Sequence, residues 1–140
     1  MTQDPYRLER FIEAQDSVYS QVLDELRRGE KRTHWMWFIF PQIQGLGSSA
    51  MAEEYAISGR EEAAAYLAHP ILGPRLEECT RLVIQVEGRP IGRIFPYPDD
   101  LKFRSSMTLF ARAAADNRLF VEALQKYFGG EQDPLTLARL

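Results

Sequence analysis

The chain has 140 residues, of which 45% are hydrophobic and 26% are charged, and its formal net charge is −3. This length is typical of one globular domain, and the composition excludes a disordered chain. The mild acidity provides no global positive field, so we expect no nucleic-acid partner. The first residues lack the segments of a secretion signal, and the longest apolar run, 35–41, is too short to span a membrane. We therefore expect a single domain over 1–140 in the cytoplasm, without a membrane partner.

A long amphipathic helix is predicted from Asp4 to Gly29. Asp4 can accept hydrogen bonds from the free amides of a helix start, and the following proline fits the first helical position. Apolar residues then recur every three or four positions, at Leu8, Phe11, Ile12, Val18, Tyr19, Val22, Leu23 and Leu26. Gln15 interrupts this face. It either reaches water at the edge or is a buried amide bonded to the aromatic segment that follows.

The aromatic segment, residues 34–49 (HWMWFIFPQIQGLGSS), contains both tryptophans and ends in a Gly-x-Gly-Ser-Ser turn. It is too aromatic for a surface connector and too interrupted by proline and glycine for a simple helix. We predict an ordered aromatic loop, with at most a short strand around Phe38. In an extended segment Trp35 and Trp37 point to opposite sides. Either both lie in the core, or one lies in the core and the other faces a cavity.

The rest of the chain also has helical patterns separated by proline and glycine. Helices are predicted from Ser48 or Ser49 to about 57, over 60–68, from 73 to 88, from Ser105 or Ser106 to 115, over 119–128 and from 133 to the terminus, with a loop over 89–104. The prediction is an all-α, compact single-domain bundle of six or seven helices.

The single cysteine, Cys79, falls on the inner face of a predicted helix. Without a second cysteine it cannot form an internal disulfide, so we interpret it as a buried structural thiol. The two histidines, His34 and His69, lie too far apart in sequence for a zinc-type ligand spacing. We therefore expect no metal and no cofactor.

Two serine-bearing helix starts are candidate anion sites, because a helix start presents free amides and the positive end of the helix dipole. One includes Ser48, and the other includes Ser105 and Ser106, with Lys102 adding positive charge. A serine before a helix also acts simply as a cap. Whether Asp100 pairs with Lys102 or leaves it free for a ligand stays open at this stage.

An indole facing a cavity suits stacking on a base, sugar or cation. His34 is a candidate general acid or base, or else a structural hydrogen bonder. The predicted ligand-binding residues are Trp35, Trp37, Gln42, Ser48, Tyr55, Lys102, Ser105 and Ser106.

Three motifs, RFIEAQ, HWMWFIFPQIQGLG and DDLKFRSSMTLF, together resemble a bacterial family of unknown function whose members often carry the label "calpastatin". The resemblance covers nearly the whole chain and implies a compact, mainly helical cytoplasmic protein without an established activity. The label itself does not suit this chain, because calpastatin-type inhibitors are long, disordered and repetitive.

A second resemblance follows the order FxFPQIxG, AEEYA, MTLF and NRLFxxAL, which is similar to the NADAR superfamily. That superfamily includes N-glycosidases that act on ribosylated nitrogen, and an acidic residue of an EHY-type motif is central to it. The matching position here is Glu53, with Glu54 in place of the histidine. The resemblance implies cleavage of a glycosidic C–N bond, in which a carboxylate stabilises an oxocarbenium-like centre or activates water. Alternatively, both glutamates simply face water.

Two functional hypotheses follow. In the first, a pocket binds a small anionic molecule, nucleotide- or ADP-ribose-like, with possible N-glycosidase-type hydrolysis and catalytic candidates Glu53 and His34. In the second, the protein is a non-enzymatic interaction or oligomerisation module that uses an apolar face. The expected oligomeric state is a monomer or a small homo-oligomer.

Overall fold

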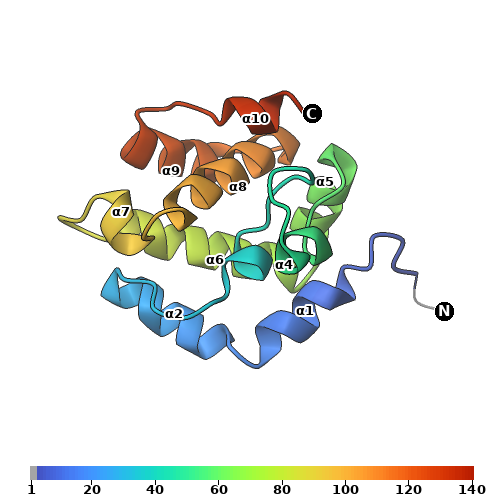
Figure 1. The fold of residues 1–140 in the computed structure, drawn as a ribbon, viewed down its shortest axis with the longest axis horizontal. Helices are drawn as coiled ribbons and strands as arrows, with labels where there is room; N and C mark the ends of the chain where they lie inside the picture. Colours follow the sequence, from blue (N-terminus) through green and yellow to red (C-terminus); the bar gives the residue numbers. More distant parts are fainter. Residues whose placement is uncertain (1–2) are drawn as a thin grey trace.

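The computed structural model describes residues 3–140, which form ten helices (Figure 1). They are α1 (Glu9–Asp16), α2 (Tyr19–Arg28), α3 (Met36–Ile39), α4 (Ala50–Glu54), α5 (Arg60–Ala68), α6 (Leu72–Gln85), α7 (Ile91–Ile94), α8 (Asp99–Ala113), α9 (Arg118–Phe128) and α10 (Pro134–Leu137). The predicted all-α class is confirmed. The predicted number of six or seven helices is too low, because the first helix is divided and two one-turn helices occupy segments expected to be loops.

The first helix divides at Ser17 and Val18, so that α1 and α2 meet at an angle (Figure 1). This bend lets α1 pack against α3 while α2 packs against α6. Asp4 accepts hydrogen bonds near the helix start as expected, from the amides of Leu8 and Glu9 at 2.7 and 3.0 Å, but the cap position is Leu8 and not Asp4. Arg7 has φ 53°, however, so the helix begins only at Glu9.

The aromatic segment contains α3 rather than a strand, and Phe38 is part of that helix. Within residues 3–140 the β-type pairing is one isolated parallel bridge between Ile43 and Ile57. This bridge holds the turn after α3 beside the chain that follows α4.

α8 is the central helix of the fold, with residues 105–111 all buried. It packs against α5, α9, α10 and α7. The predicted loop over 89–104 is wrong, because α7 and the first turn of α8 lie within it. Asp99 and Asp100 favour the helix start through its dipole, and Pro98 precedes them at the cap position. Ser105 and Ser106 therefore lie inside α8, and neither serine caps a helix.

None of the helices formed by residues 3–140 has the length and apolar character needed to cross a lipid bilayer. The same residues contain no group of three or more His, Cys, Asp or Glu side chains suited to hold a metal ion. Cys79 is buried, as predicted, and its thiol contacts the hydroxyl of Tyr19 at 3.9 Å.

Candidate functional site

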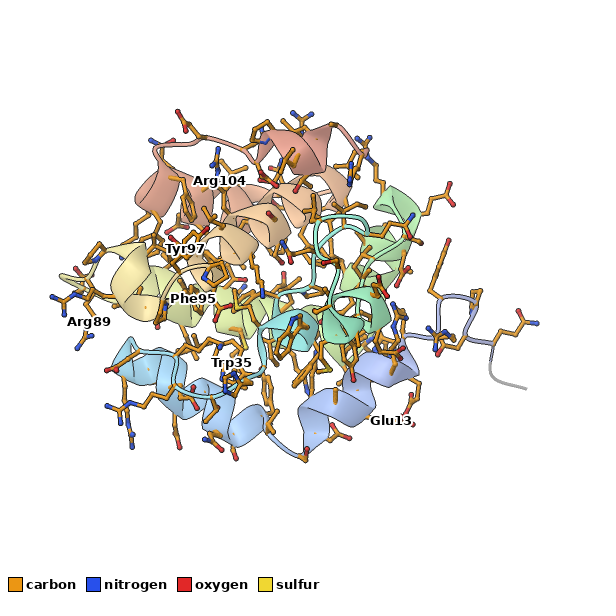
Figure 2. All side chains as sticks on the ribbon, viewed as in Figure 1. Glu13, Trp35, Arg89, Phe95, Tyr97 and Arg104 are labelled. Carbon is orange, nitrogen blue, oxygen red and sulfur yellow. The ribbon has the colours of Figure 1, made fainter. Side chains whose placement is uncertain are left out.

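The aromatic segment is fixed to the core by the buried carboxylate of Glu25. Its Oε1 accepts hydrogen bonds from the amides of Arg32 and Thr33 and from Nε1 of Trp35, and its Oε2 accepts one from Thr33 Oγ1, at 2.6–3.0 Å. Burial alone would raise the pKa of Glu25, but these hydrogen bonds lower it to about 2. Trp35 (Figure 2) is consequently held inside the core, where it is only 1% exposed.

Gln15 attaches the same segment to α1 and α5. Its Nε2 donates to the carbonyl of Phe38 at 2.7 Å and to the hydroxyl of Tyr66 at 3.1 Å, and its Oε1 accepts from Arg75 at 3.2 Å. Of the two interpretations of Gln15, the buried amide is correct. This contact fixes the position of α3, which carries Trp37.

Trp37 pairs with Lys102 across 65 positions of sequence. The Lys102 Nζ lies 5.3 Å from the centre of the Trp37 ring, a cation–π distance. The carboxylate beside Lys102 belongs to Asp99, whose Oδ1 is 3.7 Å away, and not to Asp100, which accepts a hydrogen bond from the amide of Leu101. The question that the sequence left open about Asp100 is thereby answered.

Asp99 serves two lysines. Its Oδ2 lies 2.9 Å from the Nζ of Lys31, which is itself 5.3 Å from the centre of the Trp35 ring. The closer pair is the one with Lys31, whose side chain is only 8% exposed, against 27% for Lys102. Two ammonium groups therefore share one carboxylate, and Lys102 is the less compensated of the two.

Lys102 opens onto a surface cavity of about 580 Å³ between three parts of the chain. The first wall is the turn after α3 with the start of α4, the second is one face of α8, and the third is the N-terminus of α10. The lining residues are Gln42, Leu46, Gly47, Ser48, Ser49, Ala52, Pro98, Leu101, Lys102, Arg104, Ser105, Asp133, Pro134 and Leu135. The volume is in the range of small-molecule sites.

The third wall is held to α8 by a polar network. Arg104 donates to the carbonyls of Glu131 and Gln132 at 3.2 and 2.9 Å. Ser105 Oγ donates to Asp133 Oδ2 at 2.8 Å, and the same oxygen accepts from the amide and hydroxyl of Thr136. The helix start predicted at 133 is thus confirmed, with Asp133 as its cap. These contacts also orient the lining side chains of Arg104, Ser105 and Asp133.

Four of the eight predicted ligand-binding residues line this cavity: Gln42, Ser48, Lys102 and Ser105. Trp37 and Tyr55 line a small adjoining depression that shares Gln42 with the cavity. The two others lie elsewhere, since Trp35 is in the core and Ser106 is fully buried in α8. Ser49, next to Ser48, caps α4 by accepting from the amide of Ala52 at 3.1 Å.

The two catalytic candidates do not join the lining residues. Glu53 is exposed on α4, and His34 is exposed before α3. Sequence reasoning missed Leu101, Asp133 and Leu135 as lining residues. Of these, only Asp133 could be recognised in the sequence, because an aspartate before a proline is typical of a helix start. The two leucines could not be recognised, because contact with a distant segment leaves no local sequence pattern.

The fold and the site define an all-α domain with a surface cavity beside a buried aromatic cluster. The chain belongs to the family described as "Protein of unknown function (DUF1810)", which matches residues 5–140. It is similar to the conserved hypothetical protein Rv1873 from Mycobacterium tuberculosis, with 60% sequence identity, coverage of 98% of each chain and a TM-score of 0.97 for the crystal structure. No protein with a curated description matches the sequence. The predicted membership in a family of unknown function is confirmed, whereas the comparisons support neither the calpastatin label nor the NADAR likeness.

Proposed function

We propose that the cavity binds a small anionic ligand, nucleotide-like or a simpler organic anion, through the ammonium group of Lys102. One observation carries this proposal. Within residues 3–140, Lys102 Nζ makes no hydrogen bond, although it lines the cavity and is fixed above the ring of Trp37. Its three donors are therefore available to an anion.

The charges around Lys102 support the same proposal. Asp99 lies closer to Lys31 than to Lys102, so its negative charge is largely compensated before a ligand arrives. The Lys102 ammonium is also only partly exposed, and an ion pair in such a place is screened less by water than one on the open surface. Gln42 and Ser48 add neutral polar groups to the lining.

The lining of the cavity does not support hydrolysis of an N-glycosidic bond. The NADAR resemblance implies a catalytic carboxylate at Glu53, but that side chain is exposed on α4 and is not among the lining residues. The lining carboxylate is Asp133, whose Oδ2 accepts three hydrogen bonds that cap α10 and hold it to α8. Asp133 therefore has a structural role in these hydrogen bonds, and the proposal for the cavity is binding without a catalytic step.

A protein-interaction module is the second candidate. Leu101 and Leu135 are 46% and 63% exposed at the cavity, and exposed apolar side chains of this size are typical of contact surfaces. This candidate predicts a mass that rises with protein concentration in light-scattering measurements. A constant monomer mass would count against self-association through this face.

The test of the binding proposal is a thermal-shift screen with AMP, ADP-ribose, inorganic phosphate, glucose 6-phosphate, acetate and octanoate. A ligand at about one hundred times its Kd stabilises the folded protein by about 2.7 kcal/mol, which raises the Tm by several degrees. The shift should disappear in Lys102→Ala. It should persist in Arg93→Ala, a control that also removes one positive charge but from an exposed position on α7.

A second readout is tryptophan fluorescence. Because Trp35 is buried in the core, Trp37 is the reporter near the cavity, and Trp37→Phe should remove the response to the ligand. A flat screen, or a ligand that shifts the wild type and Lys102→Ala equally, would refute the proposal.

A further inference from the structure

We infer that the ligand is an organic monoanion with an apolar body, such as a medium-chain or aromatic carboxylate. This inference rests on the proposed function and specifies its ligand class. In this arrangement the anionic group contacts Lys102 beside Trp37. The apolar body covers the side chains of Leu101 and Leu135.

The charge of the lining limits the ligand to about one negative charge. Lys102, Arg104 and Asp133 are the charged lining residues, which leaves a formal excess of one positive charge. The guanidinium of Arg104 already donates to two carbonyls and lies 3.7 Å from the carboxylate of Glu131. Lys102 makes no hydrogen bond and shares the Asp99 carboxylate with Lys31, so it is the less compensated cation of the lining, while Asp133 repels additional negative charge.

A pyrophosphate group does not match the single excess positive charge of the lining. It would bring at least two negative charges to one ammonium group, in a cavity whose lining also contains the Asp133 carboxylate. A single carboxylate is matched by Lys102 alone. The neutral groups of Gln42 and Ser48 can satisfy its remaining acceptor sites.

The second half of the inference comes from the apolar lining. Six large hydrophobic side chains are exposed within residues 3–140, and two of them, Leu101 and Leu135, line this cavity. A third, Tyr97, is 79% exposed and directly precedes the lining residue Pro98, at the turn that leads into α8 (Figure 2). An apolar ligand body would remove this surface from water, which favours binding.

The polar and apolar parts of the lining are close together. Leu101 and Lys102 are consecutive residues of α8, and Leu135 is on the wall that the Ser105–Asp133 hydrogen bond holds against that helix. A ligand that reaches both therefore needs its charge at one end and its apolar part directly beside it. Fatty and aromatic acids have this shape, whereas a nucleotide places a polar sugar next to its phosphate.

Isothermal titration calorimetry tests the inference with octanoate, octanamide, acetate and ADP. Octanoate has both parts, whereas octanamide lacks the charge and acetate lacks the apolar body. We expect octanoate to bind about tenfold or more tightly than either, a difference of about 1.4 kcal/mol per factor of ten. Lys102→Ala should weaken octanoate binding and leave octanamide binding unchanged. Leu135→Ser should weaken octanoate and leave acetate unchanged, and Arg93→Ala is the control.

The outcomes separate the inference from the proposed function. If ADP binds more tightly than octanoate and its binding requires Lys102, the anion site is real and the monoanion inference is wrong. If none of the four compounds binds the wild-type protein, the monoanion inference is wrong, and the thermal-shift screen with its wider set of anions decides the proposed function separately. Octanoate binding that is unaffected by both Lys102→Ala and Leu135→Ser would also overturn the inference.

Discussion

Replacing Glu25 with glutamine should destabilise the protein in a way that depends on pH. The Glu25 side chain is buried and accepts four hydrogen bonds, three of them at Oε1. Glutamine keeps one oxygen and replaces the other with an NH₂ group. With the NH₂ group at the Oε2 position, the Thr33 hydroxyl can turn and accept from it, but the three N–H donors then face a neutral amide oxygen in place of a carboxylate. The substitution therefore replaces charge-assisted hydrogen bonds with weaker neutral ones.

The magnitude follows from the pKa of Glu25, which the hydrogen bonds lower from 4.5 to about 2 against the opposing effect of burial. Each pKa unit corresponds to 1.36 kcal/mol, so the ionised carboxylate stabilises the folded state by about 3 kcal/mol at neutral pH. Because the folded-state pKa is the lower one, this stabilisation is present above pH 4.5. It is lost as the pH falls toward 2.

The assay is urea denaturation followed by circular dichroism at pH 7, 5, 4, 3 and 2.5. At pH 7, Glu25→Gln should be less stable than the wild type by about 3 kcal/mol, or roughly 10 °C in Tm. The difference should narrow below pH 4.5 and nearly vanish near pH 2. Glu13→Gln is the matched control, because the Glu13 side chain is exposed on α1 (Figure 2) and makes no hydrogen bond or ion pair within residues 3–140.

Two results would refute this reasoning. One is a stability difference between Glu25→Gln and the wild type that stays constant from pH 7 to pH 2.5. The other is equal stability of the two proteins at pH 7. Either would mean that the hydrogen bonds do not favour the ionised form of Glu25.

Three further predictions concern buried polar groups. Gln15→Leu should cost about 1–3 kcal/mol in urea denaturation, because it leaves a buried carbonyl without its donor, whereas the exposed Gln21→Leu should cost little. Ser106→Ala should be neutral or stabilising by about 1 kcal/mol, since its buried hydroxyl has no partner, while Ser105→Ala should be destabilising by a similar amount because it removes the single hydroxyl donor that the Asp133 carboxylate and the Leu101 carbonyl share. Burial raises the pKa of the Cys79 thiol to about 12, so a thiol reagent at pH 8 should leave the native protein unmodified and label one thiol after unfolding.

Local sequence patterns predicted the elements that local interactions determine. The helix at 60–68, the Ser49 and Asp133 caps and the buried Cys79 all follow from spacing or from hydrogen bonds within four residues. The start of α8 was missed because proline and paired aspartates occur both in loops and at helix starts. The helix predicted from 73 begins one residue earlier, at Leu72. The pattern did not show why position 73 is a glycine: a Cβ there would lie 2.1 Å from the carbonyl oxygen of Leu67.

The candidate site could be predicted only as separate pieces. The sequence singled out Trp37 as an aromatic platform and Lys102 as an anion-binding charge, but nothing in the spacing predicts that they contact each other. The same limit explains why Asp100, rather than Asp99, was considered as the partner of Lys102. Which carboxylate meets the ammonium depends on where α8 begins, and on Lys31 from a distant segment.

The shared carboxylate of Asp99 separates structural and ligand-binding roles between two lysines. Lys31 lies over Trp35 and makes the shorter ion pair, in a nearly buried position, so its charge belongs to the folded core. Lys102 lies over Trp37 with a longer contact to the same carboxylate and opens onto the cavity. An anion that binds Lys102 can replace the weaker contact while the Lys31–Asp99 pair stays intact. Loss of the Lys31 charge should therefore affect folding first, whereas loss of the Lys102 charge should affect ligand binding and leave the stability of the free protein nearly unchanged.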